Sequence, residues 1–191
     1  SAPTTARWRA GCAPTGRPER PPFVAVWIDH ESSRPTAGEL DRLAGAGLPA
    51  IEAVSFVHPG LVPQMAGAEE VAAAIQRREG VVYSGLVLNA KGAERFAATG
   101  LDELHFNLAA TESFGRENQN ATPEQALAVL AAIETDKPVS VSVSVAFGCP
   151  FEGAVDPVRV LEIVEHASEL GADEVVLADT IGVAVPRQVK E

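Results

Sequence analysis

The chain has 191 residues, 46% of them hydrophobic, and a formal net charge of −11, which allows a sizeable core in one domain or slightly more. The acidic balance argues against nucleic acid or an anionic membrane as the main partner, because both attract a basic surface. No apolar run approaches the roughly 20 residues that a membrane-spanning helix needs, and the distant cysteines, Cys12 and Cys149, form no Cys-x-x-Cys pair.

The amino-terminal segment differs in composition from the remainder. Its first 22 residues contain five prolines and four arginines but only one acid, and they show no hydrophobic periodicity. We expect residues 1–35 to be a poorly structured leader that is foreign to the domain. The segment lacks the apolar stretch of a secretory signal, and a transit peptide is the alternative. Since the two cysteines also favour a reducing compartment, we expect the cytoplasm, with the mitochondrial matrix as the alternative.

From Thr36 onward, amphipathic helices alternate with short runs of β-forming residues. Thr36, Thr122 and Asp156 are candidate helix caps, and Gly171 is a candidate helix stop. The polar segment after the third strand is expected to be a loop. The expected elements are a helix over 36–47, a strand over 50–57, a helix over 67–78, a strand over 81–88, a helix over 91–100, a strand over 103–110, a helix over 122–136, a strand over 138–147, a helix over 156–171 and a strand over 174–180.

This alternation indicates βαβ units and a parallel sheet. The strands begin roughly every 30 residues, which is the spacing of a (β/α)8 barrel of about 250 residues. A doubly wound sheet is the alternative, but its Gly-x-Gly-x-x-Gly turn is absent. We therefore predict an α/β fold in which residues 36–191 form a partial (β/α)8 TIM barrel of five to six units. Residues 23–29 are the candidate sixth strand, and even six strands cannot close an eight-stranded barrel.

Polar residues lie in or at the ends of these strands, where barrel enzymes carry out their chemistry. Glu52 lies within an otherwise apolar strand, so its carboxylate must be paired or must face a polar centre. Asp179 ends an apolar run that a parallel sheet would bury on both faces. Such residues also cap helices and turns, but together they predict a polar site around a cation or an oxygen-rich substrate. The other candidates are Asn89, Thr111, Ser144 and Thr180.

The histidines and cysteines give a weaker signal. His58 precedes a proline in a predicted loop and is expected at the surface, and no histidine has a Glu or His partner at metal-ligand spacing. Cys149 has no basic neighbour in the sequence, so we expect a buried, inert thiol. These residues therefore predict no metal site.

Four segments in order, IEAVSFVHPGLVPQMAGAEEV, VLNAKGAERFAATG, AFGCPFEG and ADTIGVAVP, resemble hydroxymethylglutaryl-CoA lyase, a family of the DRE-TIM metallolyase superfamily. The resemblance runs nearly without gaps from about Thr36 onward. The pieces SFV…VPQM and GCPFEG favour the lyase over the related isopropylmalate, citramalate and homocitrate synthases. The Asp-Thr-x-Gly strand end alone would fit all of these enzymes.

The resemblance implies an enzyme of leucine degradation and ketone body metabolism that cleaves 3-hydroxy-3-methylglutaryl-CoA to acetyl-CoA and acetoacetate. In the complete family member a divalent cation, Mg²⁺ or Mn²⁺, would lower the pKa of the substrate's tertiary hydroxyl, and cleavage would leave an enolate that needs a proton. The resemblance implies that Glu52 orients a catalytic arginine and that Asp179 lines the site. An acyl-CoA is the implied partner, and a homodimer is left open. Asn89, Thr111, Ser144 and Thr180 would contact the substrate.

The chain departs from this family in its catalytic motifs. No Arg-Asp pair precedes Glu52, and no His-x-His pair occurs, so the catalytic arginine and the metal ligands are not found in the sequence. We therefore expect a truncated or mis-framed product of a lyase gene that is inactive or nearly so. The alternatives are another Claisen-condensing enzyme or aldolase of the superfamily, and a fragment without catalytic activity.

Overall fold

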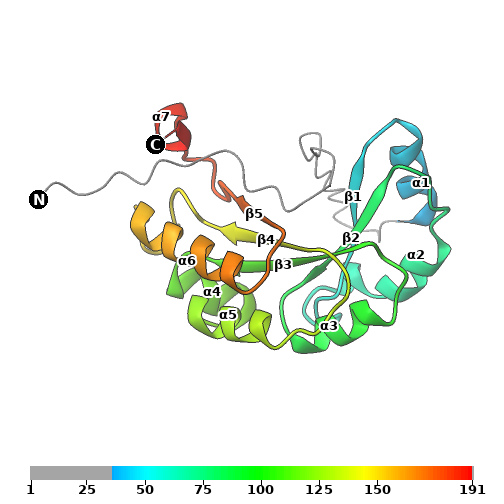
Figure 1. The fold of residues 1–191 in the computed structure, drawn as a ribbon, viewed down its shortest axis with the longest axis horizontal. Helices are drawn as coiled ribbons and strands as arrows, with labels where there is room; N and C mark the ends of the chain where they lie inside the picture. Colours follow the sequence, from blue (N-terminus) through cyan, green and yellow to red (C-terminus); the bar gives the residue numbers. More distant parts are fainter. Residues whose placement is uncertain (1–35, 191) are drawn as a thin grey trace, which may run out of the picture.

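A computed structural model describes residues 36–190, in which five parallel strands form one sheet in the order β1-β2-β3-β4-β5 (Figure 1). Each strand pairs in parallel with the next one along the chain. Each connection must therefore return the chain to the end of the sheet where the strands begin. The strands are β1 (Ala50–Ser55), β2 (Val82–Val87), β3 (Glu103–Ala109), β4 (Val139–Ser144) and β5 (Glu174–Leu177).

The helices are α1 (Ala37–Gly45), α2 (Ala68–Ala74), α3 (Ala90–Ala97), α4 (Glu112–Gln119), α5 (Pro123–Ala131), α6 (Pro157–Glu169) and α7 (Pro186–Lys190), with a 3-10 turn, η1 (Pro63–Met65). Helix α3 contacts β2, α5 contacts β3, and α6 contacts β4 and β5. Figure 1 shows these three helices on one side of the sheet. None of the helices in the described part of the chain combines the length and the apolar character that crossing a membrane requires.

The two faces of the sheet differ in polarity, and β3 shows this most clearly. Leu104, Phe106 and Leu108 are almost fully buried in the hydrophobic core, whereas His105 and Asn107 alternate with them. Because successive side chains of a strand point to opposite faces, the apolar residues of β3 lie under the helices and the polar residues lie on the other face. The helices therefore cover the apolar face, and the polar face is available for a site.

The structure confirms the five predicted strands and the predicted helix caps, but β5 ends at Leu177 and not at Thr180. Thr36 forms a capping box with Glu39, and Asp156 accepts a hydrogen bond from the Val158 N–H at 2.9 Å. Gly171 follows α6 with a φ of +94°, a conformation that favours glycine. The helix predicted over 67–78 is shorter than expected, because the backbone at Ile75, which caps α2, is already extended.

One prediction is wrong: the segment after β3 is the helix α4, not a loop. Glu112 and Arg116 form an i,i+4 ion pair along it, which favours the helix despite its polar composition. Asn120 ends the helix in a left-handed conformation. The candidate sixth strand over 23–29 and the predicted leader over 1–35 lie outside the described residues.

Gly85 allows the aromatic side chains below the sheet to approach β2 closely. A Cβ atom at Gly85 would lie 2.6 Å from Cε2 of Phe56 and 2.9 Å from Cδ1 of Leu101. Phe56 is held against Phe96 of α3 in an edge-to-face contact, with 6.0 Å between the ring centroids. The rings therefore have little freedom to move away from an added methyl group.

We predict that Gly85→Ala lowers the free energy of unfolding by about 1–3 kcal/mol, because it overpacks a filled core. Gly38→Ala is the matched control. No atom lies within 4 Å of a Cβ at Gly38 in α1, so this change should raise stability by about 0.5–1 kcal/mol. Urea denaturation measures both variants, and equal stability of the two would contradict the packing argument.

Candidate functional site

A cavity of about 550 Å³ lies on the polar face of the sheet, from the middle of the strands to their carboxyl ends. Its apolar lining includes Leu86 and Leu88 from the second strand segment and Met65 from η1. None of the lining residues that the structure describes is a lysine or an arginine. The polar lining comes from Glu52 and Ser55 on β1, His105 and Asn107 on β3, Asn118 on α4, Ser142 and Ser144 on β4, and Thr180 after β5.

A β-bulge in β1 turns two polar side chains towards this cavity. Glu52 pairs with Ser84 and Val54 pairs with Gly85, so Ala53 is the extra residue between them. In a regular strand, residues three positions apart point to opposite faces. The bulge changes this phase, and both Glu52 and Ser55 line the cavity as a result.

A row of polar side chains crosses the sheet beneath the cavity. Nε2 of His105 lies 3.9 Å from Oε2 of Glu52, and its Nδ1 lies 2.8 Å from Oγ of Ser140. The Ser140 hydroxyl donates a hydrogen bond of 2.7 Å to Oε1 of Glu103. Three strands thus contribute to one continuous polar contact, since β1 carries Glu52, β3 carries His105 and Glu103, and β4 carries Ser140.

Burial changes the acid–base properties of the first pair in this row. The side chain of Glu52 is 14% exposed and that of His105 is 10% exposed. Desolvation raises the pKa of Glu52 from 4.5 to about 7, because burial penalises the charged form. Desolvation also lowers the pKa of His105, and the nearby charge of Glu103 opposes this change. The cavity therefore contains a carboxyl group that can gain or lose a proton near neutral pH.

A second hydrogen-bond network lies closer to the carboxyl ends of the strands. Oδ1 of Asn107 accepts hydrogen bonds from the hydroxyls of Ser142 at 2.9 Å and Ser144 at 2.8 Å. Thr180 accepts a hydrogen bond of 2.8 Å from the backbone N–H of Val145, which has a φ of +54°. These contacts orient the hydroxyl groups of β4 and hold the end of β5 beside them.

Arg95 holds the segment that follows β1 at the mouth of the cavity. Its guanidinium group donates to the carbonyls of Phe56 and Val57 at 3.2 and 3.1 Å, and it forms two hydrogen bonds with Glu69. Val57 and Met65 line the cavity within this part of the chain. Since the ion pair ties α3 to α2, it fixes the path of the chain between β1 and α2.

Three of the six predicted site residues line the cavity, namely Glu52, Ser144 and Thr180. Asn89 is the N-cap of α3 and accepts a hydrogen bond from the Gly92 N–H at 2.9 Å. Thr111 is buried, and its hydroxyl donates to Sγ of the buried Cys149 at 3.1 Å. The roles of these residues in catalysis or binding stay predictions.

Asp179 lies at the predicted strand end but is not among the residues that line the cavity. Its two carboxylate oxygens accept hydrogen bonds of 2.9 Å from the N–H groups of Val183 and Ala184. The carboxylate thus closes its own loop in this structure, as Asp side chains commonly do in turns. Its expected role as a wall of the site also stays a prediction.

Five polar residues of the cavity were not predicted from the sequence, namely Ser55, His105, Asn107, Asn118 and Ser142, and His105 and Asn107 had the clearest signal. His105 and Asn107 belong to the alternating run Glu103–Leu104–His105–Phe106–Asn107, which places three polar side chains on one face of a strand. This period of two is visible in the sequence. It lies within the strand, so strand-end positions and metal-ligand spacings do not reveal it. His58, by contrast, is exposed as predicted, and its Nδ1 accepts a hydrogen bond from Gly60.

The divalent cation that the family implies does not find a complete ligand set in this structure. Among residues 36–190, no three His, Cys, Asp or Glu side chains form a group that could hold a metal ion. Glu52 and His105 are two such side chains at one place, and the rest of the cavity supplies hydroxyl and amide groups. The described residues therefore do not fit a metal centre by themselves.

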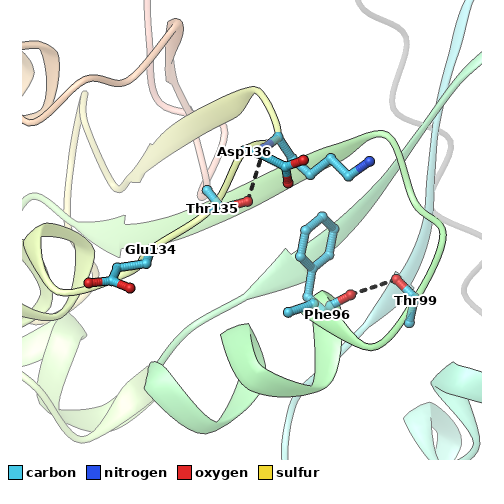
Figure 2. A pocket seen from close by; sticks show the side chains of 7 residues that line it. Phe96, Thr99, Glu134, Thr135 and Asp136 are labelled. Carbon is cyan, nitrogen blue, oxygen red and sulfur yellow. Dashed lines mark hydrogen bonds between the residues drawn. The ribbon is translucent and has the colours of Figure 1, made fainter.

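A second hollow, of about 460 Å³, lies at the other end of the sheet (Figure 2). It is lined by the end of α3 and by the segment that precedes β4, including Phe96, Glu134 and Asp136. Its hydrogen bonds are local ones, such as that from the Thr99 hydroxyl to the Phe96 carbonyl at 2.7 Å. In barrel folds this end serves stability and the carboxyl end of the strands carries the chemistry. The first cavity is therefore the candidate site.

Comparison with known proteins identifies the family of this chain. The HMGL-like family model matches residues 35–191. The chain belongs to the HMGL-like family. The curated proteins that it resembles include the (R)-citramalyl-CoA lyase of Chloroflexus aurantiacus, which is 39% identical over 165 residues, 78% of this chain and 52% of that protein. The mitochondrial hydroxymethylglutaryl-CoA lyase of Mus musculus is 40% identical over 157 residues, 80% of this chain and 48% of that protein.

Solved structures confirm the fold of this HMGL-like chain. An HMG-CoA lyase from Acinetobacter baumannii, in complex with coenzyme A and 3-methylmalate, matches with a TM-score of 0.79 and 34% identity, over 83% of this chain and 54% of that one. The structural neighbours are TIM barrels, so the predicted partial barrel is confirmed. The HMGL-like chain spans about half the length of the curated relatives it matches.

We predict that Glu52→Gln stabilises the chain at pH 8 and has little effect at pH 4. The folded-state pKa of Glu52 is raised, so the folded protein resists ionisation of this carboxyl and loses stability as the pH rises from about 4.5 to 7. A shift of this size is worth on the order of 3 kcal/mol, and glutamine removes that cost. Urea denaturation across this pH range measures the difference between the variant and the parent.

Glu165→Gln, at an exposed position on α6, is the control for this prediction and should leave the pH dependence of stability unchanged. A Glu52→Gln variant that is less stable than the parent at pH 8 would show that the Glu52 carboxylate is stabilising when ionised.

Proposed function

We propose that this chain carries part of the active site of an acyl-CoA lyase of the hydroxymethylglutaryl-CoA lyase type. One observation carries the proposal: ionisable, amide and hydroxyl side chains from three of the five strands, together with Thr180 from the turn after β5, gather at one cavity on the polar face of the sheet. Membership of the HMGL-like family supports it, as do relatives named as lyases of acyl-CoA substrates. A partial barrel has the carboxyl ends of its strands at the place where barrel enzymes bind substrate.

The proposed reaction moves a proton and breaks one carbon–carbon bond. The tertiary hydroxyl of a 3-hydroxyacyl-CoA loses its proton, its oxygen forms a carbonyl, and the bonding electrons of the broken C–C bond pass to the thioester fragment as an enolate. The enolate then takes up a proton to give acetyl-CoA. Glu52, with a pKa of about 7, is the side chain of the cavity best suited to hold or orient a proton during these steps.

The hydroxyl and amide groups of the cavity would orient the substrate. The hydroxyls of Ser142 and Ser144 both donate a hydrogen bond to Asn107. Their oxygens can therefore still accept a hydrogen bond from a substrate hydroxyl. Ser55 is buried at the cavity, and its hydroxyl has no hydrogen-bond partner within the described part of the chain. A polar group in that state is a candidate for binding an oxygen of the substrate.

A citramalyl-CoA lyase is the second candidate function. It is favoured by the Chloroflexus aurantiacus relative, whose identity to this chain equals that of the hydroxymethylglutaryl-CoA lyases within one per cent. Both candidates are lyases of branched 3-hydroxyacyl thioesters, so the same cavity would serve either of them. The two differ in the substrate that the complete protein would prefer.

We predict that joining residues 36–191 to the remaining barrel segments of the mouse lyase gives a protein that cleaves 3-hydroxy-3-methylglutaryl-CoA. Acetyl-CoA formation is the measurement, and citramalyl-CoA is the competing substrate. In this complemented barrel, Glu52→Gln should lower kcat by about 100-fold or more, as expected for a group that assists proton transfer. Glu165→Gln should leave kcat unchanged. A folded complemented barrel that cleaves neither substrate would refute the proposal.

We also predict that the purified chain alone forms no acetyl-CoA above background from 3-hydroxy-3-methylglutaryl-CoA, with Mg²⁺ or Mn²⁺ added. The reason is that residues 36–190 offer no group of three metal-ligating side chains, and catalytic residues that act as a unit lose orders of magnitude when some are missing. Sustained turnover by the parent chain that is lost in Glu52→Gln would contradict this prediction. It would mean that the chain completes its active site in another way.

A further inference from the structure

Two hydroxyl groups of the neighbouring strand hold the side chain of Asn107 in one orientation. Asn107 of β3 is in register with Ser142 of β4. Its Oδ1 accepts a hydrogen bond from the Ser142 hydroxyl at 2.9 Å and another from the Ser144 hydroxyl at 2.8 Å. A carbonyl oxygen has two lone pairs, so these two bonds use the full acceptor capacity of Oδ1. They also determine which end of the carboxamide faces β4.

The other end of the carboxamide, Nδ2, is a free donor. Among residues 36–190, Nδ2 of Asn107 has no hydrogen-bond partner, and yet it is not one of the unpaired polar atoms there that are shut off from solvent. Asn107 is only 9% exposed, and it lines the cavity. The accessible part of its side chain therefore faces the cavity, and the two hydrogens of Nδ2 are available to a ligand there.

A carboxylate that enters this cavity depends on neutral donors. None of the described residues that line it is a lysine or an arginine, and the hydroxyls of Ser142 and Ser144 already donate to Asn107. A buried anion needs N–H or O–H partners to replace water. A donor that is already held in place loses less freedom on binding than a mobile one. Nδ2 of Asn107 meets both conditions.

The fold gives this donor a rigid support. Asn107 lies between Phe106 and Leu108, which are fully buried in the core beneath the helices. Val141 and Val143 of β4 are buried in the same core. The backbone of the two strands therefore has little freedom to follow a ligand. A polar group fixed in this way selects a ligand by the charge and the position of its acceptor.

We propose that Asn107 is a specificity-determining residue whose Nδ2 hydrogens bind a free carboxylate on the acyl part of the ligand. The identity of the ligand rests on the function proposed above, because both candidate substrates are thioesters of a dicarboxylic acid and keep one free carboxylate. Ser142 and Ser144 are positioning residues, since they act on the carboxylate only through Asn107. No covalent bond forms or breaks in this step.

The test is an NMR titration of the full ¹⁵N-labelled chain at pH 6 with 3-hydroxy-3-methylglutarate and, separately, with its diamide. The two probes have the same shape, but only the first carries carboxylates. We expect the parent chain to bind the diacid about 10-fold more tightly, since a charge-assisted hydrogen bond is about twice as strong as a neutral one. The Nδ2–H signals of Asn107, assigned through its own Cβ, should move downfield as the diacid binds.

Two substitutions of Asn107 separate its donor from its shape. Asn107→Ser removes the Nδ2 hydrogens but leaves a small polar group, and it should reduce the preference for the diacid to about twofold or less. Asn107→Asp keeps the shape of the side chain but replaces the donor by an acceptor, and it should weaken binding of the diacid by about 10-fold or more. The backbone amide spectrum shows whether each variant is folded.

Two further variants test the positioning role and the effect of charge. Ser142→Ala combined with Ser144→Ala should weaken binding of the diacid and not of the diamide, because Asn107 is then no longer held. A purely structural role of the serines would weaken both. Gln76→Glu makes the same amide-to-acid change at an exposed position just after α2, outside the cavity. This control should change neither affinity.

Several results would overturn the inference. They are equal affinity of the parent chain for the two probes, no binding of either probe, a folded Asn107→Ser variant that keeps the full preference, and diacid binding that leaves the Nδ2–H signals unmoved. Failure of the lyase proposal is a separate outcome. A complemented barrel that cleaves neither substrate, while the chain still prefers the diacid through Asn107, would refute the proposed function and leave this inference intact.

Discussion

The hydrogen bonds that polar side chains make with one another across the strands are the constraint on which this structure depends. A sheet with one apolar and one polar face can bury the polar face only if its donors and acceptors find partners there. In this protein the partners come from neighbouring strands: Asn107 accepts from two serines of β4, and Ser140 connects His105 with Glu103. The same contacts that satisfy burial therefore also orient the groups that chemistry would use.

The position of Glu52 follows from a local irregularity in the backbone. Without the bulge at Ala53, Glu52 and Ser55 would point to opposite faces of β1, and one of them would enter the apolar core. With it, both line the cavity. The desolvation that shifts the proton affinity of Glu52 is thus a consequence of strand geometry. The extra residue in β1 thus places Glu52 where burial raises the pKa of its carboxyl group.

Most of the fold could be predicted from the sequence, but less of the site could. The strands and the caps at Thr36, Thr122 and Asp156 were predictable because each rests on local chemistry, such as the capping box or proline at the first helical position. Helix α4 was missed, since its polar composition conceals a helix that an ion pair and a left-handed cap support. The bulge in β1 depends on pairing with β2, which the sequence of one strand does not specify.

The side-chain directions at strand ends were harder still to predict. The side chain of an Asp or Asn at a strand end can either cap the following helix or turn, or point into the site. The geometry of the following loop decides between these two positions. In this structure Asn89 caps α3 and Asp179 closes its own loop, whereas Ser144 and Thr180 line the cavity. His105 was predictable in principle from the alternation in β3, since the helices were already expected to cover the apolar residues of that strand.

The unusual backbone of Val145 has an evolutionary consequence. A β-branched residue with positive φ costs on the order of 1–3 kcal/mol, and the Thr180 hydroxyl, which accepts from the Val145 N–H, supports that conformation from the turn after β5. Substitutions at these two positions are therefore not independent of each other. In descendants of this protein, loss of the hydroxyl at position 180 should be tolerated mainly where position 145 has become glycine or asparagine, so these two sites should covary although 35 positions separate them in the chain.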